Sequence, residues 1–388
     1  MEERFRGFIV HGYADARRDR LCFLGRLEDG RSFAAVETRW RPFFHIYKED
    51  KERCLRLLSS LDFEINPGAL ESFGGKEDLM VLEFKRFSGR SAGVSLLENM
   101  GIPSPDADLK PAELFLIERG ILGPVEIEGD FRQGRLVDLV FKDPGFLHTR
   151  ECGAVPLRLL SVDIETDVKN KTILAIGIAG PGSPGLARVL SPGSSDREGL
   201  VFHPDEDSLL RAFLSDVREA DPDVLTGWNI LDFDYPCLAE RCAFHRIPFL
   251  LGRSQEEAKF FPGAGTSGEK NPGDSPWYDR RRSAAALVPG RQVVDALRVV
   301  RSGPRRLPGY TLEAAARSIL GEGKLLASGG DRKIEELENL YREDPVRFGE
   351  YCRRDAELVP QILDKSGLFR LTLERARLTG VSLDKAWT

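Results

Sequence analysis

Two carboxylates stand one residue apart at the end of an apolar run. They are Asp163 and Glu165 in "LRLLSVDIET", residues 157–166. Side chains alternate between the two faces of a strand, so both acids point the same way. Like charges on one face repel each other unless a positive group lies between them. A bound divalent cation would explain the pair, and so would an ordinary hairpin with an acidic tip.

Two further groups of polar residues follow in chain order. The stretch "NILDFD" carries Asn229, Phe233 and Asp234 where a short strand turns into a helix. The stretch "YCRRD" carries Tyr351 and Asp355, whose spacing of four places them on one helix face. An acid at the start of a helix is usually a cap, and a Tyr/Asp pair is usually surface decoration. Each group alone is therefore weak evidence for chemistry.

Taken in order, the three groups resemble the exonuclease motifs DxE, Nx3FD and Yx3D of family B DNA polymerases. The flanking segments extend the resemblance over nearly the whole chain, and within the family they are most similar to the bacterial DNA polymerase II group: "RGFIVHGY", "RSILGEGK" and "LERARLTGVSLDKAW". The resemblance implies an α/β fold, a ribonuclease H-like mixed sheet with helices on both faces, preceded by a smaller strand-rich α+β domain. It implies the proofreading 3′–5′ exonuclease part of a DNA-directed DNA polymerase.

The resemblance also assigns roles to individual residues. Four acids would hold two Mg²⁺ ions, with Mn²⁺ able to substitute, and carboxylates suit such hard cations. Asp163 would bridge both metals, and Asp234 would hold the metal near the leaving 3′ oxygen. Glu165 and Asp355 would hold the metal that activates water. Tyr351 would orient that water, since a phenol with an ordinary pKa near 10 is a poor base.

Nucleic-acid contacts are expected near the motifs. Thr166 and Asn229 are candidates for contacts to the terminal nucleotides. Phe233 is a candidate for stacking on a base, although an aromatic residue at a strand–helix junction more often belongs to the core.

A basic strip lies further along the chain. Residues 280–306 contain eight arginines and one acid, Asp295, for a local charge of +7. Such a strip either contacts phosphates or forms a solvated basic face. Arg305 and Arg306 are its candidates for DNA contacts.

Composition narrows the class of protein. The 388 residues are 41% hydrophobic and 30% charged, with a net charge of −6, so the surface as a whole is not basic. The sequence has no apolar run near the roughly 20 residues of a membrane span and no apolar secretory segment at its start. Six scattered cysteines form no CxxC pair and five histidines form no HExxH, so free buried thiols are expected rather than zinc. The expected location is the cytoplasm, with nucleoid association when the protein is on DNA.

The pattern of predicted strands and helices, read with the resemblance, divides the chain into an N-terminal domain over 1–150 and an exonuclease domain over 151–366. The last segment, 367–388, is expected to lead toward a polymerase palm and to pack on the first domain. A hairpin turn is predicted at "DG", residues 29–30. In the second domain, strands are predicted at 157–165, 172–179 and 185–191, with helices at 205–220 and 234–246. A Gly/Pro/Ser-rich loop is predicted at 262–277.

The polymerase motifs DxxSLYP, KxxxNSxYG and DTD are absent from the sequence. The chain is therefore expected to be a fragment of a longer polymerase, or a separately encoded half, with no polymerase activity of its own. Its implied partners are a single-stranded DNA 3′ end or primer terminus, the palm, fingers and thumb, and in the full-length enzyme a sliding clamp. Two alternatives are a free-standing ribonuclease H-like 3′–5′ nuclease and a non-catalytic nucleic-acid-binding module.

Overall fold

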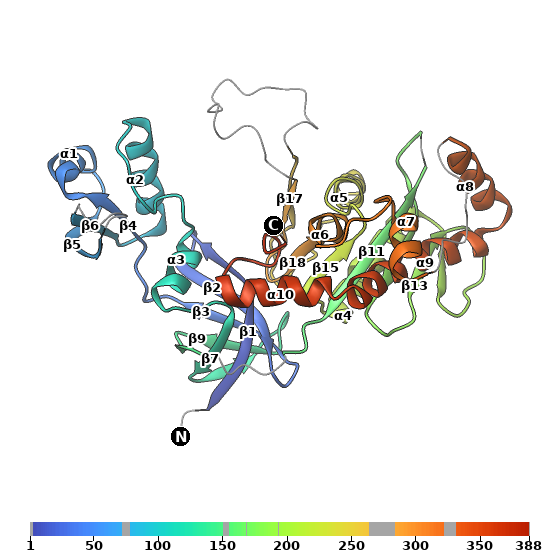
Figure 1. Cartoon of the computed structure of the whole chain (residues 1–388), viewed down its shortest axis with the longest axis horizontal. Helices are drawn as coiled ribbons and strands as arrows, with labels where there is room; N and C mark the ends of the chain where they lie inside the picture. Colours follow the sequence, from blue (N-terminus) through green and yellow to red (C-terminus); the bar gives the residue numbers. More distant parts are fainter. Residues whose placement is uncertain are drawn as a thin grey trace. The chain divides into compact units, whose positions relative to one another are not determined.

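The computed structural model describes residues 3–71, 78–149, 155–167, 169–192, 194–263, 284–321 and 331–387. The chain forms two compact units, Met1–Val155 and Pro156–Thr388, where the sequence placed a boundary after residue 150. Figure 1 follows both units along the chain by colour. Each unit has strands and helices of its own and is described separately.

The first unit contains a seven-stranded sheet in the order β10-β7-β1-β2-β3-β9-β8. The strands are β1 (Arg4–Asp15), β2 (Arg20–Leu27), β3 (Ser32–Glu37), β7 (Pro124–Glu128), β8 (Phe131–Gln133), β9 (Leu139–Lys142) and β10 (Gly145–His148). Strands β2 and β3 form the hairpin predicted at "DG", and Gly30 adopts the positive φ of 87° that such a turn favours. Helix α3 (Pro111–Glu118) packs on β1 and β2.

A second, three-stranded sheet in the first unit has the order β4-β6-β5. It has its own core with α1 and α2, centred on Phe44, Leu82 and Phe84. The elements are β4 (Phe43–Tyr47), η1 (Lys48–Asp50), α1 (Lys51–Leu57), β5 (Phe63–Glu71), β6 (Asp78–Phe84) and α2 (Phe87–Asn99). The strands of the first unit therefore divide between two sheets.

The second unit is built on a six-stranded mixed sheet in the order β14-β13-β12-β11-β15-β18. Strand β11 pairs antiparallel with β12 and parallel with β15, and β15 pairs parallel with β18. The strands are β11 (Leu159–Thr166), β12 (Ile173–Ala179), β13 (Leu186–Leu190), β14 (Leu200–His203), β15 (Val224–Gly227) and β18 (Gln292–Asp295); β16 (Lys259–Phe261) and β17 (Ala285–Leu287) form a separate pair. The three predicted strands are confirmed to within two residues at each end.

Helices cover both faces of this sheet, as predicted. One face packs Val162 and Ile164 against apolar side chains of α4 and α5. The other face packs Ala175 and Val189 against α9. The helices are α4 (Glu206–Ala220), α5 (Asp234–Phe244), α6 (Ala296–Ser302), α7 (Leu312–Ile319), α8 (Asp331–Glu343), α9 (Pro345–Lys365) and α10 (Leu368–Thr379). Figure 1 shows α9 running beside β11 and β13.

The helix starts follow signals in the sequence. Asp205, the capping residue of α4, accepts the N–H of Ser208 at 2.8 Å. Helix α9 begins with Pro345 after the capping residue Asp344. Helix α10, in the segment expected to lead toward a palm, packs on α6 and α9 within the second unit. Most of the predicted 262–277 loop lies outside the described residues.

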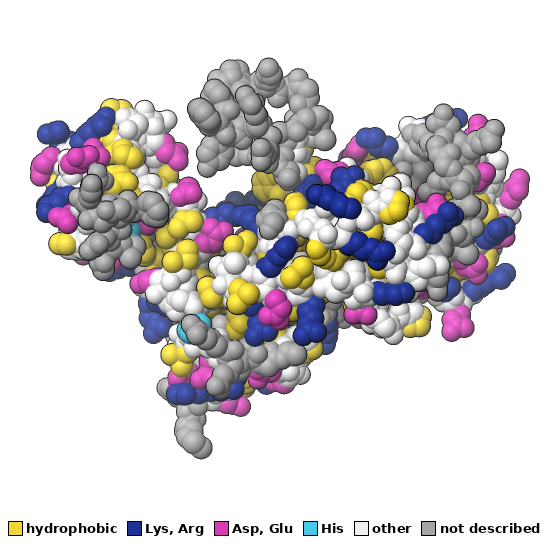
Figure 2. All heavy atoms as spheres, viewed as in Figure 1, with side chains coloured by type: hydrophobic (Ala, Val, Ile, Leu, Met, Phe, Trp, Pro, Cys, Tyr) yellow, Lys and Arg dark blue, Asp and Glu magenta, His cyan; other side chains and the backbone are white. Residues whose placement is uncertain are grey.

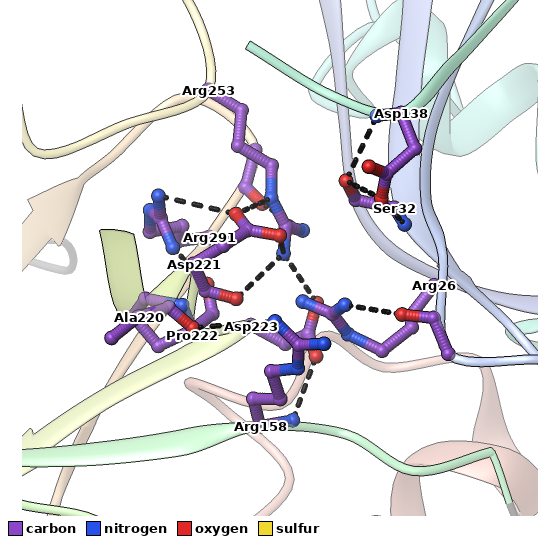
Figure 3. Close-up of polar contacts among 12 residues, drawn as sticks. Arg26, Ser32, Asp138, Arg158, Ala220, Asp221, Pro222, Asp223, Arg253 and Arg291 are labelled. Carbon is purple, nitrogen blue, oxygen red and sulfur yellow. Dashed lines mark hydrogen bonds and ion pairs between the residues drawn. The ribbon is translucent and has the colours of Figure 1, made fainter. Parts of the chain in front are cut away.

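Buried ion pairs connect the amino ends of the parallel strands β11, β15 and β18 (Figure 3). The Arg253 guanidinium lies 2.8 Å from Asp223 and 2.7 Å from Asp221. Asp223 also accepts the backbone N–H of Arg158, just before β11, at 2.7 Å. Arg291, just before β18, donates to the carbonyl of Pro222 and pairs with Asp221. These contacts align β11, β15 and β18 at the ends opposite their carboxyl termini.

The same picture labels a smaller polar contact in the first unit. The Asp138 carboxylate accepts from both the backbone N–H and the hydroxyl of Ser32, at 2.7 and 2.8 Å. It thereby joins the start of β3 to the residue before β9. Within the described parts of the chain, no helix is long and apolar enough to cross a membrane.

The buried carboxylate of Glu206 connects α4 to β12 and α5. It accepts the N–H of Ile173 at 2.8 Å and the Arg241 Nε at 2.8 Å, and His245 Nε2 lies 2.7 Å away. Burial alone would raise the pKa of Glu206, but the hydrogen bonds from Arg241, the Ile173 amide and His245 hold it below its ordinary value of 4.5. The folded state therefore gains stability from the ionised form above that ordinary value and loses it as the pH falls.

We expect Glu206→Gln to lower the free energy of unfolding by about 3 kcal/mol at pH 7, because it breaks a buried ion pair. The difference from wild type should shrink as the pH falls below 4.5, where the wild-type carboxylate takes up a proton. Urea unfolding from pH 3 to pH 8 measures this. Asp207→Asn is the matched control, since Asp207 makes an exposed ion pair in the same helical turn. A constant difference across this pH range would contradict the assignment.

Candidate active site

Asp163 and Glu165 lie on β11 and share the face of the sheet that α9 covers. Their neighbours Val162 and Ile164 point to the opposite face, into the core with α4 and α5. The predicted alternation is therefore observed: apolar side chains of β11 enter one core, and its two acids meet α9. Both acids are half-buried.

Helix α9 brings a third acid to this pair. Asp163, Glu165 and Asp355 each place one carboxylate oxygen within 4.8 Å of the others. Asp355 is 3% exposed. Three carboxylates at this separation repel one another in the absence of a cation, and together they offer the oxygen ligands that Mg²⁺ and Mn²⁺ prefer. The geometry therefore fits a divalent cation, with ligands separated by 190 residues of chain.

Tyr351 lies one helical turn before Asp355 and is buried beside the acids. Its side chain is 1% exposed and is hydrogen-bonded to Asp355. Burial raises the pKa of Tyr351 far above its usual value, and the charges of Asp355, Glu165 and Asp163 raise it further. The phenol therefore keeps its proton at every physiological pH.

The close approach of α9 to the sheet depends on Gly177 of β12, which pairs with Asp163. A Cβ at this position would lie 2.5 Å from the carbonyl oxygen of Cys352 and 3.1 Å from the Cβ of Ala356. Only glycine leaves room for the helix backbone here. The Cys352 Sγ consequently reaches within 3.8 Å of Asp163 Oδ2.

Asp234, the fourth predicted acid, adjoins this group but is not one of the three mutually close carboxylates. It begins α5, is 3% exposed, and its Oδ1 accepts the N–H of Ile164 at 3.1 Å. That amide lies between Asp163 and Glu165 on β11. Burial raises the pKa of Asp234 to about 7, and the charge of Asp295 adds to the rise.

The predicted nucleotide contacts lie around the acids. Thr166 ends β11 after a register shift and is half-buried. Asn229 is half-buried and adopts a left-handed φ of 66°. Phe233 is 44% exposed, so the interpretation that placed it in the core is wrong. An exposed ring is what base stacking requires.

The basic strip predicted over 280–306 is not one continuous surface. Arg291 is 3% exposed and belongs to the buried ion pairs of Figure 3, and Arg298 donates to Ala284 and Asp232. Residues 280–282 lie outside the described residues. Arg301, Arg305 and Arg306 are exposed. Figure 2 shows Lys and Arg side chains gathered on the face over α6, α7 and α10.

The cysteines behave as expected from their spacing. In the part of the chain that the structure describes, all five are free and four of them are buried. Cys237 is half-buried, and Cys152 lies outside the described residues. Cys352 next to Asp163 was not singled out from the sequence, because a cysteine inside a helix carries no sign of what it will pack against.

A cavity of about 390 Å³ lies in the first unit, far along the chain from the acids. Its aromatic residues are Trp40 and Phe43. Each of its arginines lies within 4.0 Å of a glutamate that also lines it; the pairs are Arg39–Glu37, Arg41–Glu83 and Arg119–Glu118. Because its charges neutralise one another, the cavity indicates no particular ligand.

Comparison with known proteins identifies the family of the chain. Residues 106–315, more than half of the chain, match the model of the DNA polymerase family B exonuclease domain. The chain belongs to DNA polymerase family B. The matched range contains Asp163, Glu165 and Asp234, and it ends before Tyr351 and Asp355.

Several family B members are similar to this chain. DNA polymerase II of Escherichia coli (strain K12) is 30% identical over 294 residues, which cover 74% of this chain and 34% of that protein. The DNA polymerase delta catalytic subunit of Caenorhabditis elegans is 29% identical over 252 residues, covering 60% of this chain and 22% of that protein. The chain thus spans about a third or less of the length of these relatives.

A solved family B structure shares the fold. The family B DNA polymerase from the hyperthermophilic archaeon Pyrobaculum calidifontis superposes with a TM-score of 0.73 at 19% identity, covering 98% of this chain and 48% of that one. The prediction of a family B exonuclease domain with a ribonuclease H-like mixed sheet is confirmed.

We expect Gly177→Ala to weaken divalent-metal binding by about 10-fold or more, because the added methyl group pushes α9, and with it Asp355, away from β11. Calorimetric titration with Mn²⁺ measures the affinity. Gly180→Ala is the matched control just after the same strand, since a Cβ there meets only ordinary contact at 3.5 Å. Equal Mn²⁺ affinity in the two variants would show that the approach of α9 does not set the cluster.

Proposed function

We propose that this chain is a metal-dependent 3′–5′ exonuclease that hydrolyses phosphodiester bonds at DNA 3′ ends. The observation that carries the proposal is the convergence of Asp163, Glu165 and Asp355 from β11 and α9 within 4.8 Å. Membership of DNA polymerase family B supports the substrate class, since the matching family model describes the exonuclease domain.

The proposed cofactor is a pair of divalent cations, Mg²⁺ or Mn²⁺. Bound between carboxylates, such ions stabilise the charge that develops on the attacking and leaving oxygens of a phosphodiester. Asp163, Glu165 and Asp355 supply three anionic oxygens that suit a hard cation, while Asp234 is the fourth proposed ligand. The Ile164 amide fixes the orientation of the Asp234 side chain, so this carboxyl is held next to β11 rather than free to rotate.

Tyr351 is proposed to orient the nucleophilic water. Its proton is retained and is donated to Asp355, so the phenol oxygen is left to accept a hydrogen bond from the water, and the neutral phenol cannot act as the general base. Its hydroxyl is held by the contact with Asp355, which fixes its direction. Positioning of this kind lowers the barrier by removing orientational freedom before the reaction.

The proposed substrate is the 3′ end of single-stranded DNA. Phe233 offers an exposed ring on which a base can stack, and Asn229 and Thr166 offer hydrogen-bonding groups near the acids. Arg305 and Arg306 are proposed phosphate contacts. No hydrogen bond or ion pair within the described part of the chain occupies either guanidinium, in contrast to Arg291 and Arg298.

Proofreading of a primer terminus, cooperation with palm, fingers and thumb domains, and action with a sliding clamp belong to the proposal for the full-length polymerase. So does a cytoplasmic location on nucleoid DNA. We assign no polymerase chemistry to these 388 residues, because their sequence lacks the motifs that carry it.

We expect Asp163→Ala to abolish release of nucleotides from a 3′-labelled single-stranded DNA in Mg²⁺, since a ligand proposed to serve both cations is lost. Thermal stability should stay the same or rise, because one of three mutually repelling carboxylates is gone. Glu240→Ala, at an exposed acid on α5, is the control and should keep wild-type activity.

Near-native hydrolysis by Asp163→Ala would refute the site. An RNA oligonucleotide of the same sequence, assayed in parallel, tests the substrate. Faster digestion of RNA than of DNA would favour the alternative of a free-standing ribonuclease H-like 3′–5′ nuclease.

Reversing Arg305 and Arg306 to glutamate should weaken binding of single-stranded DNA and flatten the slope of log affinity against log salt by up to about 1.4 for the two lost phosphate contacts. Fluorescence anisotropy in EDTA measures binding without hydrolysis. The control reverses Arg211 and Arg218, two exposed arginines of α4. If both double variants leave the same slope, the exposed arginines near α6 are ordinary solvated surface.

A further inference from the structure

Asp295 lies at the edge of the sheet where the parallel strands β11, β15 and β18 end, and no role was predicted for it from the sequence. It ends β18, and the register places it beside Gly227 at the end of β15. Strands β11, β15 and β18 run parallel, so their carboxyl ends meet at the same edge. Asp163 and Glu165 lie near the end of the first of these strands. Asp295 is therefore the acid at the end of the third, and it is 1% exposed.

The two carboxylate oxygens of Asp295 bond to different parts of the chain. Oδ1 accepts the N–H of Arg298 at 3.2 Å and caps α6. Oδ2 accepts the N–H of Leu231 at 3.3 Å. A helix cap needs only the first of these bonds. The second reaches into residues 228–233, which join β15 to α5.

Arg298, in the first turn of α6, forms a second link to residues 228–233. Its guanidinium donates to Asp232 Oδ2 at 3.0 Å and to the carbonyl of Ala284 at 2.6 Å. Two contacts at the start of α6 therefore hold this segment. The Leu231 amide donates to Asp295, and the Asp232 carboxylate accepts from the Arg298 side chain.

The segment 228–233 carries the predicted nucleotide contacts Asn229 and Phe233 and leads directly into Asp234. Asn229 holds a left-handed backbone at φ 66°, and its carbonyl accepts from the amides of Asp232 and Phe233. The segment is thus one tight turn, closed by hydrogen bonds within it. A shift of this turn would displace Phe233 and would also displace Asp234 from the Ile164 amide.

We propose that Asp295, supported by Arg298, is a positioning residue for the nuclease site: it fixes the turn 228–233 so that Asn229, Phe233 and Asp234 face the Asp163–Glu165–Asp355 cluster. This inference rests on the proposed exonuclease function. Asp295 does not touch the reacting atoms and acts only through the turn. Its burial, and its two bonds to separate segments, distinguish it from the caps Asp205 and Asp344, whose side chains accept from the first turns of their own helices.

Four proteins test the proposal: wild type, Asp295→Ala, Arg298→Ala and the control Asp205→Ala. Asp205→Ala also removes an N-cap, but from α4, so it matches the loss of helix capping without touching the turn. Arg298→Ala keeps the Asp295 cap, because that bond uses the Arg298 backbone. It removes only the side-chain contact to the turn, so it still tests the proposal if Asp295→Ala fails to fold.

Hydrogen exchange of the peptide covering 229–233, followed by mass spectrometry, is the first measurement. Exchange should be faster in Asp295→Ala, because the Leu231 amide loses its acceptor, and in Arg298→Ala, because Asp232 loses its donor. It should be unchanged in Asp205→Ala. Hydrolysis of 3′-labelled single-stranded DNA in Mg²⁺ is the second. We expect kcat to fall by about 10- to 100-fold in both test variants, as misplacement of a site by about 1 Å does.

Unchanged exchange in both test variants, or an equal fall of kcat in Asp205→Ala, would overturn the positioning role. If wild type itself does not release nucleotides, the proposed exonuclease function fails. The exchange measurement and Mn²⁺ titration of the same proteins still decide whether Asp295 holds the turn and its metal-binding acid.

Discussion

The mutual repulsion of three carboxylates is the constraint on which the rest of the second unit depends. Asp163, Glu165 and Asp355 are held within 4.8 Å of one another, an arrangement that the chain would relieve by moving α9 away from β11. Apolar contacts prevent this movement, because Phe348 and Cys352 on α9 are buried against Ala175 and Val189. Gly177 removes the last steric obstacle by letting the helix backbone approach the strand. Hydrophobic burial thus keeps together charges that would otherwise separate, and a bound cation would attract all three carboxylates and offset their repulsion.

The opposite end of the same strands is stabilised in a different way. Arg253 and Arg291 neutralise Asp221 and Asp223 there, so every acid of that cluster has a positive partner. The two ends of the sheet therefore differ in electrostatic character although both are rich in aspartate. Charges are balanced where only alignment of strands is required, and negative charge accumulates at the carboxyl ends, where β-strands of such sheets present their ligand sites.

At the carboxyl ends of the strands, the turn 228–233 follows β15 and leads into Asp234, which bonds to β11 between Asp163 and Glu165. Its hydrogen bonds to Asp295 and Arg298 come from β18 and α6, elements that carry no predicted motif residue. The site is consequently assembled in layers: the acids on β11 and α9, the turn that leads to Asp234, and the buried contacts that hold the turn. Arg298 illustrates the consequence for the basic strip, because a residue that looks like a DNA contact in the sequence instead orients a neighbouring segment.

Periodicity and order of motifs determined much of this protein from sequence alone. The period of two put Asp163 and Glu165 on one face, the spacing of four put Tyr351 and Asp355 on one helix face, and the strands and helices around them follow from local patterns. Only the tertiary structure decided that these faces meet, that Phe233 is exposed, and that Arg291 is buried while Arg305 is not. These outcomes depend on contacts between residues far apart in the chain. Gly177 and Asp295 show the reason most plainly: their roles are set by the helix backbone and the turn that pack against them, and no neighbouring residue in the sequence records those partners.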